Sequence, residues 1–308
     1  MVVNLIYLVC GLAILIFGAE IIIRGSVSLG KKINISLFVI GIVIVAGGTS
    51  LPELASSISA VTSGHANLAL GAIVGSNIAN LILILAATTL LIPIYDISQN
   101  QINQGFVNII LAITLILMGF LSINFNFVFG IIAILSLSTI MFLQFKNSQP
   151  KIDEVQDKAA YSFVISIVFI IIGILLLIYG SRLFVGSAIS IAKQLNIPES
   201  IVGISIVAFG TSLPELVVGV MSALKRKVDF ALGNILGSNI YNVLGVLGIS
   251  SFFGNFKMPS NLVNQDLIFM VIVTLLILFF MLFKKCLDRT YGILGLILYV
   301  GYIFYIYN

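Results

Sequence analysis

Long apolar segments, separated by short polar ones, make up most of the chain. An α-helix needs about 20 apolar residues to cross the hydrocarbon layer of a bilayer. Ten segments reach about this length, and the pattern therefore predicts an all-α membrane protein with ten transmembrane helices. The expected helices cover residues 2–23, 35–61, 67–92, 105–122, 125–145, 161–185, 200–224, 230–253, 265–283 and 290–307.

The composition excludes a soluble globular protein. Of the 308 residues, 60% are hydrophobic and only 8% are charged, whereas an ordinary soluble domain carries about 25% charged residues. The net charge of +4 is too small and too dispersed to form the basic face that nucleic acids require. The expected surroundings are a lipid bilayer, and neither a nucleic acid nor a protein partner is indicated.

Two sequence elements recur in the second half of the chain at one constant spacing. Residues 41–55 match residues 203–217 at 12 of 15 positions, and residues 70–81 match residues 232–243 at 8 of 12. Both pairs are offset by 162 residues. A duplication therefore relates the two halves of the chain.

Each half contains five of the expected helices. An odd number of crossings makes the second half enter the membrane in the opposite orientation, which is the inverted-topology repeat of many secondary transporters. The predicted domains are residues 1–145, the first half, and residues 161–308, the second half. Residues 146–160 contain the longest polar stretch and are expected to form a cytoplasmic linker.

The distribution of Lys and Arg over alternate loops predicts the orientation in the membrane. Twelve of the fifteen basic residues fall on one side and three on the other. The positive-inside rule places the richer side in the cytoplasm and both termini outside it, in a cell (inner) membrane. The richer side holds Arg24, Lys31, Lys32, Lys146, Lys151, Lys158, Lys225, Arg226, Lys227, Lys284, Lys285 and Arg289, and the other holds Arg182, Lys193 and Lys257.

Two acidic residues stand apart from the others. Nine of the eleven, Glu20 among them, lie in expected loops or near expected helix ends, but Glu53 and Glu215 fall in the middle of membrane segments. Burying a carboxylate at bilayer depth costs about 3 kcal/mol or more, so such a group marks a functional site by default. Because the two glutamates are equivalent in inverted repeats, both are expected at the membrane midplane, where secondary transporters hold their substrates.

A proline directly precedes each of these glutamates. Pro52 and Pro214 lack the amide hydrogen of a regular helix, so each is expected to break its helix and to free backbone carbonyls. In a membrane, such carbonyls are tolerated where protein, water or an ion satisfies them. An alternative is a capping box, in which Ser50 caps a restarted helix and Glu53 returns to its amide. Capping and ion binding are compatible with each other.

The other polar side chains of the two elements are neutral oxygen donors. Oxygen ligands in such number suit Ca²⁺, which takes about 6–8 of them, and lack the thiolates and imidazoles that zinc or copper prefers. Na⁺ fits similar oxygen cages. For the serines and asparagines of the second element, hydrogen bonding between packed helices is the alternative. The candidate ligands are Glu53, Glu215, Thr49, Thr211, Ser50, Ser212, Ser76, Ser238, Asn80 and Asn242.

Glycines spaced four residues apart accompany the second element in both halves. Gly71 and Gly75 in the first half, and Gly233 and Gly237 in the second, are expected to allow neighbouring helices to approach closely.

The two elements resemble the repeats of the sodium/calcium exchanger family, in the calcium/cation antiporter superfamily, and of its prokaryotic branch in particular. The family pattern is GTSLPE followed by GSNI-x-N or GSNI-x-D, and it occurs here at 48–53 with 75–80 and again at 210–215 with 237–242. The resemblance covers the whole chain and implies that broken helices 2, 3, 7 and 8 form the ion-binding core. It also implies that the carbonyls of Ala46 and Ala208 contribute to sodium binding.

The resemblance implies a function as well. A protein of this kind exports Ca²⁺ in exchange for Na⁺ by alternating access, with both ions as substrates, no cofactor and no enzymatic activity. Some relatives have an Asp at one of the positions of Asn80 and Asn242, so this site keeps two formal negative charges, which one Ca²⁺ balances. Coupling to H⁺ or K⁺ and, in a different class, an uncoupled cation channel are the alternatives.

Overall fold

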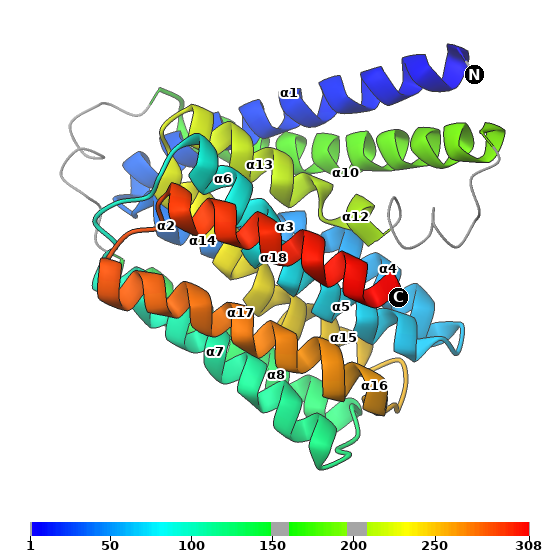
Figure 1. Ribbon diagram of the computed structural model, residues 1–308. Helices are drawn as coiled ribbons and strands as arrows, with labels where there is room; N and C mark the ends of the chain where they lie inside the picture. Colours follow the sequence, from blue (N-terminus) through cyan, green and yellow to red (C-terminus); the bar gives the residue numbers. More distant parts are fainter. Residues whose placement is uncertain (1, 149–159, 196–207, 308) are drawn as a thin grey trace.

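The computed structural model describes residues 2–148, 160–195 and 208–307, the side chains of residues 208, 209 and 307 excepted. In this part of the chain the regular secondary structure is helical (Figure 1). Eight helices are long and apolar enough to cross a membrane, and a bent pair adds a ninth span. The expected all-α membrane architecture is confirmed. The expected helix 200–224 lies partly outside the described residues, so the count of ten stays a prediction.

Five of the spans are single uninterrupted helices. They are α1 (Val2–Ile33), α7 (Gln99–Phe120), α8 (Phe127–Lys146), α10 (Phe163–Gln194) and α18 (Arg289–Tyr307).

The other spans are assembled from shorter helices, most of them joined by π-helical segments, which are rare and frequently occur at functional sites. The bent pair consists of α2 (Leu37–Ile40), η1 (Gly41–Val45) and α3 (Ala46–Thr49), followed at a 40° bend by α4 (Leu51–Thr62). The remaining segments are α5 (Ala66–Ala79), η2 (Asn80–Ile84) and α6 (Leu85–Leu91); α12 (Ala208–Thr211) and α13 (Leu213–Leu224); α14 (Val228–Ile240), η4 (Tyr241–Val246) and α15 (Leu247–Ser250); and α16 (Ser260–Leu262), η5 (Val263–Leu267), α17 (Ile268–Phe279) and η6 (Phe280–Lys284).

Helices α1 and α10 lie side by side along one edge of the molecule (Figure 1). They run antiparallel and touch at glycines. A Cβ atom added to Gly18 would lie 3.1 Å from the carbonyl oxygen of Gly173, and one added to Gly173 would lie 2.9 Å from the carbonyl oxygen of Gly18. Only residues without a side chain allow the two backbones to come this close.

Both of these helices extend beyond their expected ends at residues 23 and 185, so these predicted boundaries are wrong. Each has 32 residues and is therefore about 48 Å long. Arg24 ends the apolar run of α1, but the helix stops only at Asn34, which adopts a left-handed conformation with φ 55°. Hydropathy marks where the lipid ends, whereas the terminating residue decides where the helix ends.

The longer α1 also corrects the expected position of Glu20, which lies inside the helix and not near its end. Its carboxylate accepts a hydrogen bond from Arg24 one turn further along, with Nε 2.5 Å from Oε1, and another from Lys225, with Nζ 2.8 Å from Oε1. The two cations offset the cost of placing a carboxylate within the helix.

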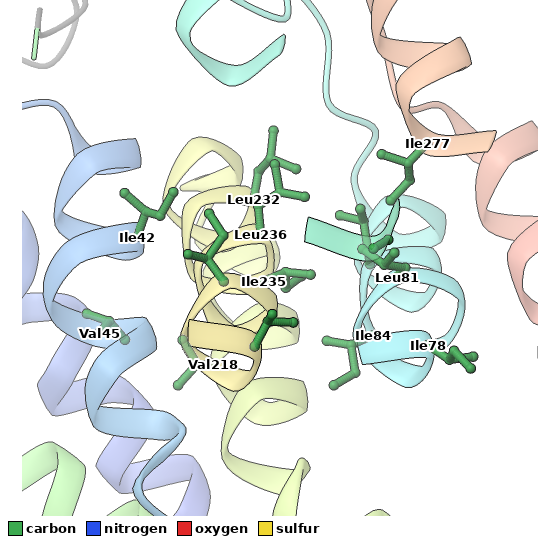
Figure 2. Packing of buried hydrophobic residues seen from close by; sticks show 14 of the residues in the cluster. Ile42, Val45, Ile78, Leu81, Ile84, Val218, Leu232, Ile235, Leu236 and Ile277 are labelled. Carbon is green, nitrogen blue, oxygen red and sulfur yellow. The ribbon is translucent and has the colours of Figure 1, made fainter. Parts of the chain in front are cut away.

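Helix α14 lies at the centre of the molecule, and each of its residues from Phe230 to Ile240 is buried. Figure 2 shows Leu232, Ile235 and Leu236 between η1 on one side, which contributes Ile42, and η2 on the other, which contributes Leu81. The apolar side chains of α14 thus pack between these two segments, and its polar residues Asn234, Ser238 and Asn239 are buried as well.

The glycines of α14 pack closely against the first half of the chain. A Cβ atom on Gly233 would lie 2.2 Å from the carbonyl oxygen of Phe38, and one on Gly237 would lie 2.7 Å from the Cβ atom of Ala46. The close-packing prediction is confirmed for these two glycines. For Gly71 and Gly75, whose equivalent partners fall at 200–208, it stays a prediction because residues 196–207 lie outside the described part of the chain.

Candidate ion-binding site

Two short helix breaks position the two glutamates. Between α3 and α4, Ser50 has φ −82° and ψ 5°. Ser212, between α12 and α13, takes nearly the same conformation, with φ −87° and ψ 5°. Glu53 and Glu215 lie in the first turn of the helix that follows and are 5% and 1% exposed. Each break therefore places a buried carboxyl group at a helix N-terminus, where the backbone dipoles favour negative charge.

The capping alternative is not realised at these breaks. Neither Ser50 nor Ser212 makes a side-chain hydrogen bond to the start of its helix. Pro52 and Pro214 occupy the first turn, where the missing amide hydrogen costs little. The two serine hydroxyls therefore remain available for contacts inside the site.

Side chains from the two halves of the chain meet around the carboxyl groups. The hydroxyl of Ser212 is 3.5 Å from Oε1 of Glu53 and 3.3 Å from Oγ of Ser76. The hydroxyl of Ser238 donates to Oε1 of Glu215 at 3.4 Å. Residues 53 and 76 belong to the first half and residues 212, 215 and 238 to the second, so the site lies where the halves interlock.

The threonines lie at the same place. The hydroxyl of Thr49 is 3.5 Å from that of Ser238 and 3.3 Å from the carbonyl oxygen of Ala46. That carbonyl also accepts the amide hydrogen of Ser50, at 3.0 Å. Thr211 faces the carboxyl group of Glu53. Ala208 is the first residue of α12, and its role stays a prediction.

The two asparagines of the second element sit at π-helical segments. Asn80 begins η2 and Asn242 lies in η4, and both are 1% exposed. The amide nitrogen of Asn80 donates to Oδ1 of Asn239, at 2.9 Å, and that of Asn242 donates to Oδ1 of Asn77, at 3.0 Å. The NH2 group of each asparagine thus donates a hydrogen bond to the opposite half of the chain, and its Oδ1 remains without a partner.

Several buried oxygens of the site have no hydrogen-bond partner within the described protein. A buried polar atom that loses its partner in water and finds none in the protein costs about 1–3 kcal/mol, and native structures contain few of them. Five of these atoms belong to residues proposed from the sequence as ligands. They are Oγ of Ser50, Oε2 of Glu53, Oδ1 of Asn80, Oε2 of Glu215 and Oδ1 of Asn242.

Three further asparagines touch these residues and were not among the candidates. Asn234 is fully buried, and its Oδ1 accepts from the hydroxyl of Thr49 at 3.3 Å. Its counterpart in the first half is Ala72, so the site is not symmetric. Asn77 and Asn239 lie inside the repeated GSNI sequence, and this recurrence is the signal by which they could have been found.

The chemistry of the donors points to a hard cation. Two carboxylates and several neutral oxygens match the preferences of Ca²⁺. Among the described residues, no group of three or more His, Cys, Asp and Glu side chains gathers at one point, which is the arrangement that a transition metal would favour.

Comparisons with known proteins point to one family. A family model described as sodium/calcium exchanger protein matches residues 3–149 and 165–308. The membrane protein MJ0091 of Methanocaldococcus jannaschii is 33% identical over 294 residues, which cover 96% of this chain and 95% of the relative. The sodium/calcium exchanger MaX1 of Methanosarcina acetivorans is 28% identical, with 98% and 97% covered.

A solved structure is similar over nearly the whole chain. The sodium-calcium exchanger NCX_Mj, in crystals soaked with Na⁺ and Ca²⁺, aligns with a TM-score of 0.87 at 31% sequence identity and covers 98% of both chains. The motifs, the helical membrane architecture and these matches lead to one conclusion. The chain belongs to the sodium/calcium exchanger protein family and is a multi-pass membrane antiporter.

Proposed function

We propose that this protein exports Ca²⁺ from the cytoplasm in exchange for Na⁺ by alternating access. Ca²⁺ and Na⁺ are its substrates, and it uses no cofactor. The observation that carries the proposal is the set of five buried oxygens without hydrogen-bond partners, on Ser50, Glu53, Asn80, Glu215 and Asn242. A bound cation satisfies such oxygens, and when it leaves, another cation or water must replace it.

The two glutamates are the central ligands in this proposal. Glu53 and Glu215 bring two negative charges, which one Ca²⁺ neutralises. Oε2 of each carboxylate has no hydrogen-bond partner among the described residues. Neutral oxygens complete the coordination, which in proteins takes about 6–8 oxygens for Ca²⁺. These come from Thr49, Thr211, Ser50, Ser212, Ser76, Ser238, Asn80 and Asn242 and from the carbonyls of Ala46 and Ala208.

Exchange for Na⁺ is supported by the relatives that align over the full chain. MaX1 carries sodium and calcium in its name, and the NCX_Mj crystals were soaked with both ions. Relatives named for potassium as well, such as human sodium/potassium/calcium exchanger 5, align over only 35% of this chain. Coupling to K⁺ or H⁺ is the alternative within the family.

The proposed topology has ten transmembrane helices in two inverted five-helix halves, residues 1–145 and 161–308, joined by a cytoplasmic linker over 146–160. The spans numbered 2, 3, 7 and 8, which carry the helix breaks, form the ion-binding core. We place the protein in the cell (inner) membrane with both termini outside the cytoplasm. The distribution of basic residues supports this orientation.

Calcium uptake into proteoliposomes tests the function. Vesicles are loaded with Na⁺, with K⁺ or with a large organic cation, and a fourth set carries a proton gradient. We expect uptake of Ca²⁺ only where Na⁺ leaves the vesicle. Glu53→Gln and Glu215→Gln are each expected to lower uptake at least about tenfold, since a central charged ligand is lost. Asp96→Asn is the control, because Asp96 is an exposed acid.

Each alternative has its own outcome. Uptake driven by K⁺ or by the proton gradient would overturn the coupling ion. Uptake into vesicles that hold only the organic cation would indicate a channel. Normal uptake by both Gln variants would contradict the ligand assignment.

A further inference from the structure

Asn77 and Asn239, next to the candidate site, join Asn80 and Asn242 in a series of hydrogen bonds, here called the ladder. They occupy equivalent positions, 162 residues apart, and are 3% and 4% exposed. Asn239 accepts a hydrogen bond from the amide of Asn80, at 2.9 Å, and Asn77 accepts one from the amide of Asn242, at 3.0 Å. Each therefore contacts the proposed ligand of the opposite half.

A backbone carbonyl determines the orientation of the Asn239–Asn80 half of this ladder. The amide nitrogen of Asn239 lies 3.3 Å from the carbonyl oxygen of Asn77. A carbonyl can only accept, so the nitrogen of Asn239 must face it and Oδ1 of Asn239 must face Asn80. Asn80 then has to present its own nitrogen to Oδ1 of Asn239. Its oxygen is left without a partner inside the protein.

The side-chain oxygens of both ladder asparagines already accept hydrogen bonds, so neither is counted among the ligands. Both line a separate cavity of about 10 Å³, together with Asn108 and Thr274, and this volume holds about one water molecule. The residues around this cavity do not include either glutamate. Asn77 and Asn239 therefore act on an ion only through the asparagines that they hold.

We propose that Asn77 and Asn239 are positioning residues, which hold the amides of Asn242 and Asn80 with the oxygen toward the transported ion. This inference rests on the proposed function, because it takes Asn80 and Asn242 as ligands. A side-chain amide that turns over presents hydrogens to the cation in place of an oxygen. Residues that orient a metal ligand change metal affinity about 10–100-fold when they are replaced.

The first test measures the KM for Ca²⁺ and the maximal rate in proteoliposomes. Asn239→Ala and Asn77→Ala are each expected to raise the KM for Ca²⁺ about tenfold while leaving most of the maximal rate. Asn108→Ala is the matched control, because Asn108 is also buried but its amide donates to the carbonyls of Gln104 and Leu236 and to neither ligand. An equal rise of KM in the control would overturn the proposal.

The second test combines each ladder variant with each ligand variant. If Asn239 acts through Asn80, then Asn239→Ala should raise the KM by less than about twofold on an Asn80→Ala background but by its full amount on an Asn242→Ala background. Asn77→Ala should show the reverse pattern. A merely structural effect would be the same on both backgrounds, and that result would overturn the proposal.

The outcomes separate this inference from the proposed function. If Asn80→Ala raises the KM but Asn239→Ala does not, the positioning role is wrong and the ligand assignment stands. If Asn80→Ala and Asn242→Ala both leave the KM unchanged, the ligand assignment is wrong and the positioning role falls with it. Because Asn77 and Asn239 act through different ligands, failure of one variant to fold leaves the other as a complete test.

Discussion

The ammonium group of Lys225 lies 2.7 Å from Oε2 of Glu20 and joins α13 to α1. The side chains of Lys225 and Glu20 are 33% and 20% exposed, so the pair is partly shielded from water. Arg24 shares the same carboxylate. Helix α1 packs along α10, and this ion pair is therefore one of the polar contacts that connect the α1–α10 pair to the rest of the protein.

We expect Glu20→Gln to destabilise the folded protein, because it leaves Lys225 and Arg24 close together without their carboxylate. The loss should be about 1 kcal/mol, between the values for exposed and for buried ion pairs. Thermal unfolding of the protein purified in detergent measures it. Lys284→Gln is the comparison, since the Lys284–Asp288 pair is longer, at 3.8 Å, and more exposed. An equal loss in both variants would contradict the prediction.

The contact between α1 and α10 depends on glycines. A Cβ atom at position 173 would lie 2.8 Å from the Cβ atom of Ile22, closer than such atoms can approach. We expect Gly173→Ala to push the helices apart and to cost about 1–3 kcal/mol of stability, as overpacking does. Gly186→Ala, in the same helix but with no described atom within 4 Å of the added carbon, should cost nothing. The melting temperatures of the two variants decide the question.

A substitution at Ser50 distinguishes a helix-capping role from an ion-binding role. It makes no capping bond, so Ser50→Ala should leave thermal stability nearly unchanged while it raises the KM for Ca²⁺. Ser98 is a matched control, because it forms a complete capping box with Gln101 at the start of α7. Ser98→Ala should cost about 1 kcal/mol of stability and leave the KM unchanged. The reverse pattern, with instability in Ser50→Ala and a normal KM, would show that Ser50 is structural.

Cys286 reports the orientation of the protein in the membrane. It lies between η6 and α18, beside basic residues that the proposed topology places in the cytoplasm. In a Cys10→Ser background, a membrane-impermeant maleimide should label it from the cytoplasmic side only. Partial burial and the nearby Asp288 raise the pKa of the Cys286 thiol. Less thiolate is therefore present at neutral pH. Labelling should be slower than for a fully exposed cysteine with an ordinary pKa, and it should accelerate as the pH rises. Labelling from the outside alone would contradict the proposed topology and indicate the opposite orientation.

Much of this protein could be predicted from local patterns. The apolar segments reveal membrane helices because hydrocarbon accepts only segments that satisfy their own backbone hydrogen bonds. Glu53 and Glu215 were identifiable because a carboxylate in such a segment is costly and both occur at one repeat spacing. The helix breaks at Ser50 and Ser212 lie two residues before Pro52 and Pro214, whose missing amide hydrogens predict an interruption there.

Other features depend on neighbours that are distant in the sequence. Gly47 is equivalent to Phe209 in the other half, and the repeat alone does not explain why these two residues differ in size. In the structure, a Cβ atom at position 47 would lie 3.0 Å from the ring of Tyr241, whose hydroxyl donates to the carbonyl of Val43 at 2.7 Å. A large residue from the second half thus occupies the space left by a small one in the first.

The end of α1 and the position of Glu20 also could not be predicted from the hydropathy pattern. Hydropathy located the lipid boundary near residue 23, but the helix continues to Ile33 because its terminating residue is Asn34. Glu20 is tolerated inside α1 because Lys225 reaches it from a helix some 200 positions later in the chain. No local pattern contains that partner.

Composition, periodicity and repeat spacing thus account for the membrane class, the duplication and the identity of the buried carboxylates, since each is a property of neighbouring residues or of one fixed spacing. Folding in three dimensions settles which oxygen atoms keep hydrogen-bond partners. Asn80 and Asn239 are 159 positions apart, and their contact forms because η2 and α14 pack together around the site. The direction in which an amide points is a consequence of that packing.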